Sequence, residues 1–214
     1  MNNKETALSR SVTAKVLELQ RKAVDETTRY ADVPARLARL RRAINAEPGS
    51  VPEIWSDTIG VLPEDLWARR DQPSRYEQAA HSTITLFALH VQSARTAVHR
   101  PGISLGAAAR RLASARTGVR GEHDPAIFKR FQALATASSR AELNHHLRSL
   151  ITLMRSEGVQ LDYGLLAADL AGMEIPERAD RIRLRWGRDY HRVSHDDQEN
   201  DGQEQDDSSN EAQK

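Results

Sequence analysis

The stretch HRPGISLGAAARRLASARTGVR, from His99 to Arg120, decides the fold. Pro101 and Gly102 break the chain with a turn, and Ser104 then stands where a helix N-cap is expected. The apolar positions that follow recur at helical spacing: Leu105, Ala108, Ala109 and Leu112. The stretch therefore predicts a helix beginning at Ser104, and the turn before it is the expected joint between two groups of helices.

The other face of this helix combines small residues with arginines, namely Gly106, Ala107, Arg110 and Arg111. Small residues would allow a sugar–phosphate backbone to approach, and Ser104 with the first free amides would supply donors for an anion. The alternative is that Gly106 and Ala107 pack against another helix and the arginines are only solvated. No acidic residue occurs between His99 and Arg120, so no partner in the stretch itself neutralises these cations.

Helical periodicity also dominates the rest of the chain, and no clean period-two strand is found. Helices are expected over 7–25, from Pro34 to about Ile44, after Ser74 to Val98, from Pro125 through Leu134, from Ser139 to Gly158, over 163–170 and from Pro176 to about Val193. Residues 47–63 are expected to form a loop with a short turn around Trp55. The prediction is an all-α fold of seven or eight helices in two small bundles, residues 1–98 and 99–193, followed by a disordered acidic tail, residues 194–214.

Charge is distributed unevenly along the 214 residues, although the net charge is only +1. Eight of the 30 acidic residues lie in 194–214, so residues 1–193 carry a net charge of +8. Of the 31 basic residues, 26 are arginine, whose planar guanidinium pairs with phosphate through two hydrogen bonds. A basic body of this composition indicates a polyanionic partner. For the tail, a role in solubility and competition with DNA for the basic face both remain open.

Several classes of protein are excluded by the residues that are missing. The chain has no cysteine, which excludes disulfides and thiolate zinc sites. No Walker loop, HExxH or GxSxG motif occurs, and the side chains of His145 and His146 diverge by about 100° on a helix and cannot share a metal. We therefore expect no catalytic activity, cofactor or metal. Without a signal-like N-terminus or an apolar run long enough to span a membrane, the sequence predicts a cytoplasmic protein with no membrane contact.

Two segments concentrate the basic residues. Between residues 95 and 130 they outnumber Glu122 and Asp124 and comprise Arg95, Arg100, Arg110, Arg111, Arg116, Arg120, Lys129 and Arg130. In the last helix an apolar row is expected to be buried: Ile175, Ala179, Ile182, Trp186, Tyr190 and Val193. Beside it runs a row of arginines: Arg178, Arg181, Arg185, Arg188 and Arg192. This row would follow a phosphate backbone over about 21 Å. Alternatively it is a solvated face with pairs such as Glu177–Arg181 and Arg185–Asp189.

Four segments together resemble a known family: RLARLRRA (Arg36–Ala43), TAVHRPGISLGAAARRLA (Thr96–Ala113), VQLDYGLLAADL (Val159–Leu170) and RIRLRWGRDYHR (Arg181–Arg192). Their order and spacing resemble those of the CasB small subunit of the type I-E CRISPR surveillance complex, Cascade. The resemblance implies an all-α, non-catalytic subunit that is present as a pair of copies. Its implied partners are the large subunit, the backbone subunits, the crRNA-containing complex, and the target and displaced DNA strands.

The resemblance also implies that basic surface residues bind the DNA backbone and stabilise the R-loop. Those that match the basic surface of the family are Arg41, Arg42, Arg75, Arg110, Arg111, Arg178 and Arg181. The basic segments described above add Arg100, Arg116, Arg120, Lys129, Arg130, Arg185 and Arg188. Two alternatives remain open, a sequence-specific DNA-binding regulator and a protein–protein adaptor without affinity for nucleic acid.

Overall fold

The computed structural model describes residues 2–24, 32–118 and 123–192, and within them every regular element is helical. The α-helices are α1 (Asn3–Val24), α2 (Val33–Arg42), α3 (Arg75–His90), α4 (Leu105–Thr117), α5 (Pro125–Ala135), α6 (Arg140–Ser156), α7 (Tyr163–Met173) and α8 (Pro176–His191). Short 3-10 turns lie between α2 and α3: η1 (Ala43–Asn45), η2 (Pro52–Asp57), η3 (Ile59–Val61) and η4 (Glu64–Leu66). The prediction of an all-α fold with seven or eight helices is confirmed.

Side-chain caps explain where most of these helices begin. Ser74 accepts a hydrogen bond from the backbone N–H of Glu77, whose carboxylate accepts from the N–H of Ser74 in return. Ser104, Asp124 and Ser139 cap α4, α5 and α6 at the predicted places, each side chain accepting a hydrogen bond from a backbone N–H of the first turn. The capping box expected for Ser139 is incomplete, because the Glu142 carboxylate accepts from Ser138 instead. The helix boundaries therefore follow from local chemistry.

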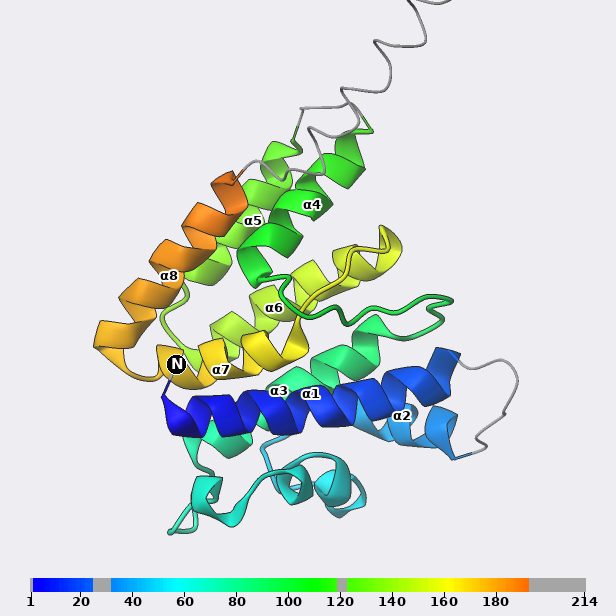
Figure 1. The fold of residues 1–214 in the computed structure, drawn as a ribbon, viewed down its shortest axis with the longest axis vertical. Coiled ribbons are helices and arrows are strands. Elements are labelled where there is room, and N and C mark those ends of the chain that lie inside the picture. Colours follow the sequence, from blue (N-terminus) through cyan, green and yellow to red (C-terminus); the bar gives the residue numbers. More distant parts are fainter. Residues whose placement is uncertain (1, 25–31, 119–122, 193–214) are drawn as a thin grey trace, which may run out of the picture.

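Helix α7 lies at the centre of the arrangement and is buried around most of its circumference. It packs along α1 and against α3 and α8 (Figure 1). At Gly164 the backbone of α7 approaches α1 so closely that an added Cβ would lie 2.1 Å from the Thr13 hydroxyl oxygen. Helices α4, α5 and α8 form a second group at one end of the long axis, and α6 packs against both α3 and α5.

One continuous hydrophobic core runs from Leu8 to Tyr190, so the two predicted bundles share their interior. The segment around the expected joint is itself held in place, because Leu161 exchanges backbone hydrogen bonds with Val98 and Arg100. Gln20 of α1 accepts hydrogen bonds from the backbone N–H groups of Val98 and His99. The division at residues 98 and 99 stays a prediction, and the predicted tail, residues 194–214, lies outside the described residues.

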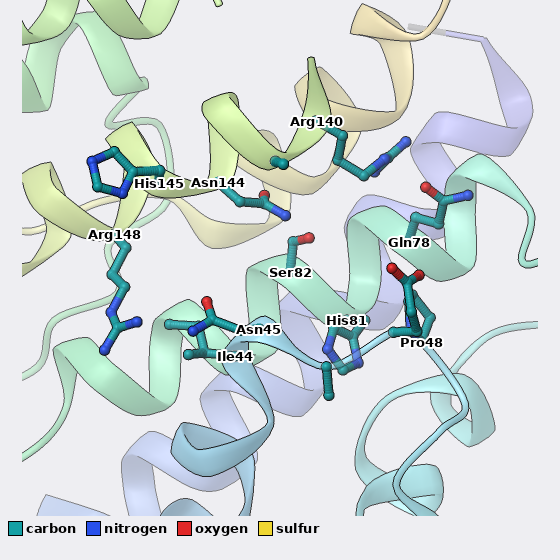
Figure 2. Close-up of a pocket in the computed structure, with 13 residues that line it drawn as sticks. Ile44, Asn45, Pro48, Gln78, His81, Ser82, Arg140, Asn144, His145 and Arg148 are labelled. Atoms are coloured by element: carbon teal, nitrogen blue, oxygen red, sulfur yellow. The ribbon is translucent and has the colours of Figure 1, made fainter.

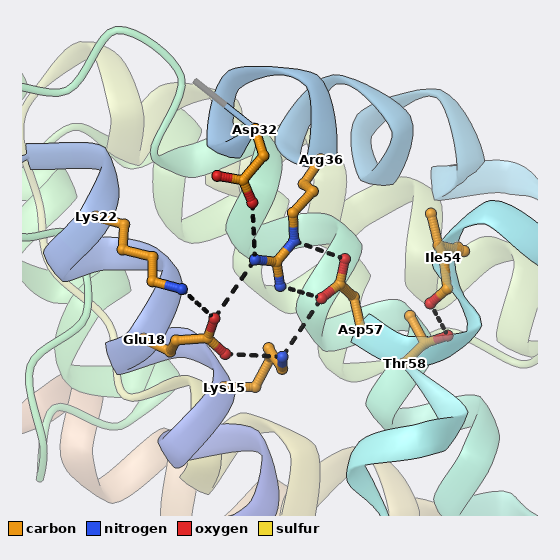
Figure 3. Close-up of polar contacts among 8 residues, drawn as sticks. All are labelled: Lys15, Glu18, Lys22, Asp32, Arg36, Ile54, Asp57 and Thr58. Atoms are coloured by element: carbon orange, nitrogen blue, oxygen red, sulfur yellow. Dashed lines mark hydrogen bonds and ion pairs between the residues drawn. The ribbon is translucent and has the colours of Figure 1, made fainter. Parts of the chain in front are cut away.

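A polar network joins α1, α2 and η2 (Figure 3). Arg36 pairs with the buried carboxylate of Asp57 and with Glu18, and Lys15 bridges the same two carboxylates at 3.4 and 2.8 Å. Burial alone would raise the pKa of Glu18, but hydrogen bonds from Lys15 and Lys22 outweigh it and lower this pKa to about 2. The cations of this network are therefore satisfied within the fold.

The predicted helix from Ser74 to Val98 is too long. Helix α3 ends at His90, and Ser93 has a backbone φ of +61°, which no helix accommodates. Val91 and Val98 are nevertheless buried, the latter beside the backbone pairing with Leu161. Their spacing therefore imitates helical periodicity although the chain has left the helix.

Candidate nucleic-acid interface

The arginine row of α8 divides into residues that hold the fold together and residues that face solvent. Arg178 donates to the buried carboxylate of Glu5, with Nη2 2.8 Å from Oε2. Arg185 pairs with Asp169 of α7, which is 2% exposed and also accepts from the indole N–H of Trp186 at 2.7 Å. Two of the five arginines of the row are therefore paired with buried carboxylates inside the fold.

Arg181 and Arg188 form the outer part of the row. Both are exposed, and within the described part of the chain neither makes a hydrogen bond or an ion pair. Neither of the two ion pairs suggested by the sequence, Glu177–Arg181 and Arg185–Asp189, is formed. Asp189 instead accepts a hydrogen bond from the Ser104 hydroxyl at 2.7 Å and lies 3.6 Å from Arg192. Two positive charges of α8 thus remain available to a partner.

Helix α4 does not offer the flat outer face that was one of its two interpretations. Gly106 is buried against α8, and a Cβ there would lie 2.1 Å from the carbonyl oxygen of Trp186. Arg116 is also not free of partners, because its Nε lies 3.0 Å from Asp124 and its Nη1 3.4 Å from Glu157. The packing interpretation is therefore correct for Gly106.

The remaining predicted residues of this region lie in several environments. Arg110 and Arg111 are half-buried. Burial raises the pKa of the Tyr190 phenol, and the nearby charge of Arg110 partly opposes this shift. Arg100 and Lys129 are exposed, and Arg130 donates to Ser149 at 3.4 Å. Arg120 lies outside the described residues. The surfaces of α4 and α5 therefore carry positive charge, but these side chains do not form one defined site.

Three arginines form a cluster: Arg41 and Arg42 at the end of α2, and Arg155 in the last turn of α6. Arg41 donates to the backbone carbonyl of Ala88 at 3.4 Å, and Arg155 donates to the Gln92 side chain at 2.9 Å. Burial lowers the pKa of Arg41, and the nearby charges of Arg155 and Arg42 lower it further. Among the described residues no carboxylate forms an ion pair with any of the three.

Arg75, the other residue expected from the family likeness, is engaged locally. Its Nη2 donates to the Tyr76 hydroxyl at 2.6 Å, and its guanidinium lies 4.7 Å from the centre of that ring. Its cation–π contact with Tyr76 stabilises this position. Arg75 therefore stands apart from the three-arginine cluster.

A polar cleft between α3, α6 and residues 44–48 was not predicted (Figure 2). It has a volume of about 490 Å³, and α6 contributes Arg140, Asn144 and Arg148 to its wall. Arg140 is paired with Glu174 at 2.6 Å, whereas Arg148 is exposed and its guanidinium has no partner among the described residues. Arg140, Asn144 and Arg148 are four residues apart, which in the sequence already indicates that they share one face of a helix. The position of α3 opposite them was not visible in the sequence.

Comparisons with known proteins agree with this arrangement. A family profile described as CRISPR-associated protein Cse2 matches residues 36–191. The chain belongs to the Cse2 family. The crystal structure of CasB from Thermobifida fusca is 32% identical, with a TM-score of 0.67 over 86% of this chain and 98% of that one. CasB from Thermus thermophilus, at 24% identity and a TM-score of 0.60 over 86% of this chain and 97% of that one, shares the fold. Among curated protein sequences, none is a significant match.

Membership of the Cse2 family supports a place for this chain as a small subunit of a type I CRISPR Cascade complex. The resemblance seen in the sequence is thereby confirmed at the level of the family. In the described ranges no helix is long and apolar enough to cross a membrane. In the same ranges no group of three or more histidine or acidic residues could hold a metal ion.

Proposed function

We propose that this Cse2-family chain is the non-catalytic small subunit of a type I-E Cascade complex and binds the backbone of the opened DNA strands without reading their sequence. The observation that carries the proposal is the cluster of Arg41, Arg42 and Arg155. Arg155 and Arg42 each lie close enough to Arg41 to repel its guanidinium, and no carboxylate in the described ranges forms an ion pair with any of the three.

Phosphate groups would relieve this repulsion. Each guanidinium can donate two parallel hydrogen bonds to phosphate oxygens, which are shorter and stronger than neutral hydrogen bonds. Arg181 and Arg188 supply two further exposed cations on α8. Because such contacts go to the sugar–phosphate backbone, they position a strand and carry no sequence information.

Small contributions of this kind suffice for a role in R-loop formation. The exchange of a DNA duplex for an RNA–DNA hybrid is nearly balanced in free energy, so a few phosphate contacts on the opened strands shift the equilibrium. In this proposal the partners are the large subunit, the backbone subunits, the crRNA and both DNA strands, with a pair of copies in the complex and the protein in the cytoplasm.

The test is the affinity of the purified protein for unstructured single strands of two unrelated sequences. The double variant Arg42→Gln with Arg155→Gln should weaken binding to both strands about tenfold, because two charged hydrogen-bonding groups are lost. Arg41 is left in place because it donates to the backbone of Ala88 inside the fold.

The matched control is Arg69→Gln with Arg70→Gln. These exposed arginines precede α3, whereas Ala88 and Gln92, which contact the cluster, lie at the other end of that helix. The control removes the same net charge and should change affinity less than twofold. Equal losses in both double variants, or a strong preference for one sequence, would contradict the proposal, and the second result would favour a sequence-specific regulator.

A further inference from the structure

The cleft between α3, α6 and residues 44–48 has the dimensions of a small-ligand site. Its volume of about 490 Å³ lies within the range typical of such sites. In Figure 2 the side chains of Asn144 on α6 and Ser82 on α3 point toward each other across it. Arg148, from the next turn of α6, also lines the cleft, and in Figure 2 its side chain extends to one end of it, away from Asn144 and Ser82.

Polar groups in the cleft have unused hydrogen-bonding capacity. Ser82 is only 6% exposed, yet within the described residues its hydroxyl makes no hydrogen bond. The Asn144 amide likewise has no partner there, and Gln78 uses only its Nε2, which donates to the carbonyl of Pro73 at 2.9 Å. These polar atoms are open to solvent in the cleft, so they are available to a ligand with both donors and acceptors.

The cleft and the cluster of Arg41, Arg42 and Arg155 share helix α6, which contributes Arg148 to the cleft and Arg155 to the cluster. Arg148 and Arg155 are seven residues apart, which places them on the same flank of α6 about 10 Å from each other. A strand that contacts Arg155 and runs along α6 would therefore reach Arg148 at the cleft. The ligand must then combine a phosphate with hydrogen-bonding edges.

We propose that this cleft takes up one unpaired nucleotide of a single strand, with its phosphate at Arg148 and its base edge at Asn144 and Ser82. A paired base has no free Watson–Crick edge to offer Asn144 and Ser82, so a duplex cannot make these contacts. Among the residues that line the cleft there is no Phe, Tyr or Trp, and its rings are the imidazoles of His81 and His145. Hydrogen bonds at Asn144 and Ser82 would hold the base edge. This inference rests on the proposed function, because the strand must first bind the cluster.

The test compares the affinities of Asn144→Ala and Ser82→Ala for a single strand and for the duplex of the same sequence. Each variant should weaken single-strand binding about 3- to 10-fold, the effect of one lost hydrogen bond, and leave duplex binding unchanged. The control is Gln132→Ala, which removes an exposed amide from α5 and should change neither affinity. An unchanged single-strand affinity, or equal losses for strand and duplex, would overturn the inference.

Two further measurements separate this site from simple anion binding. A strand containing 2-aminopurine should become more fluorescent on binding as the base leaves its stack, and Asn144→Ala should reduce that rise. A deoxynucleoside monophosphate should displace the strand at a lower concentration than inorganic phosphate does. Equal displacement by both, or no rise with the unchanged protein, would reject the site. The double variant Arg42→Gln with Arg155→Gln tests the proposed function separately. It is expected to weaken binding of the single strand and of the duplex alike, and unchanged affinities would show that the proposed function is wrong.

Discussion

Gly106 lies where α4 crosses α8, and the backbone of Trp186 occupies the space next to it. An added Cβ would lie 2.1 Å from the Trp186 carbonyl oxygen, and a backbone atom cannot move away as a flexible side chain can. We expect Gly106→Ala to lower the free energy of unfolding by about 1–3 kcal/mol, the usual cost of overpacking. Urea denaturation measures this change.

Gly187 is the matched control on the opposing helix. Nothing lies within 4 Å of a Cβ added there, and its position is helical. Gly187→Ala should therefore stabilise the protein slightly, because alanine has the higher helix propensity. If Gly106→Ala were as well tolerated as Gly187→Ala, the close crossing of α4 and α8 would be wrong.

The sequence pattern around Gly106 left two interpretations open for a physical reason. A helix of small residues presents the same spacing whether a partner helix or solvent lies outside it. The choice depends on Trp186, which is 80 residues away along the chain. Local periodicity contains no information about that contact.

At the scale of single elements, α8 is attached to α7 and α1 through buried carboxylates. Asp169 is 2% exposed, and Arg185 provides its only positive partner among the described residues. Arg185→Ala would leave this carboxylate buried without a counter-charge, and burial already raises its pKa. We expect a loss of about 3 kcal/mol in the free energy of unfolding.

The same substitution three residues along the helix provides the comparison. Arg188 is exposed and, in the described ranges, unpartnered, so Arg188→Ala should change stability by less than about 0.5 kcal/mol. Equal effects of the two substitutions in denaturant titrations would argue against the division of the α8 row into structural and solvent-facing arginines.

Most elements could be predicted because their signals are local. Ser74, Ser104, Asp124 and Ser139 cap helices at the predicted places, and the apolar spacing of Leu8, Val12, Val16 and Leu19 identifies a helix whose inner face is fully buried. The end of α3 was missed because Val91 and Val98 are buried by tertiary contacts, which periodicity alone cannot distinguish from helix.

At the scale of the whole molecule, the excess of arginine was visible in the sequence. Which of these arginines pair with carboxylates in the fold was not. Arg178 pairs with Glu5, 173 residues away, and Arg185 pairs with Asp169 across two helices. These contacts remove two members of the predicted row. Conversely, Arg155 enters the cluster with Arg41 and Arg42 only because α2 and α6 both pack against α3.

The most direct test of the central claim is the salt dependence of single-strand binding. For the unchanged protein, the logarithm of affinity should fall linearly with the logarithm of salt concentration, by about 0.7 per phosphate contacted. Arg42→Gln with Arg155→Gln should make the slope shallower by about 1.4, whereas Arg69→Gln with Arg70→Gln should leave it unchanged. Identical slopes for all three proteins would contradict the assignment of the backbone contacts to the arginine cluster.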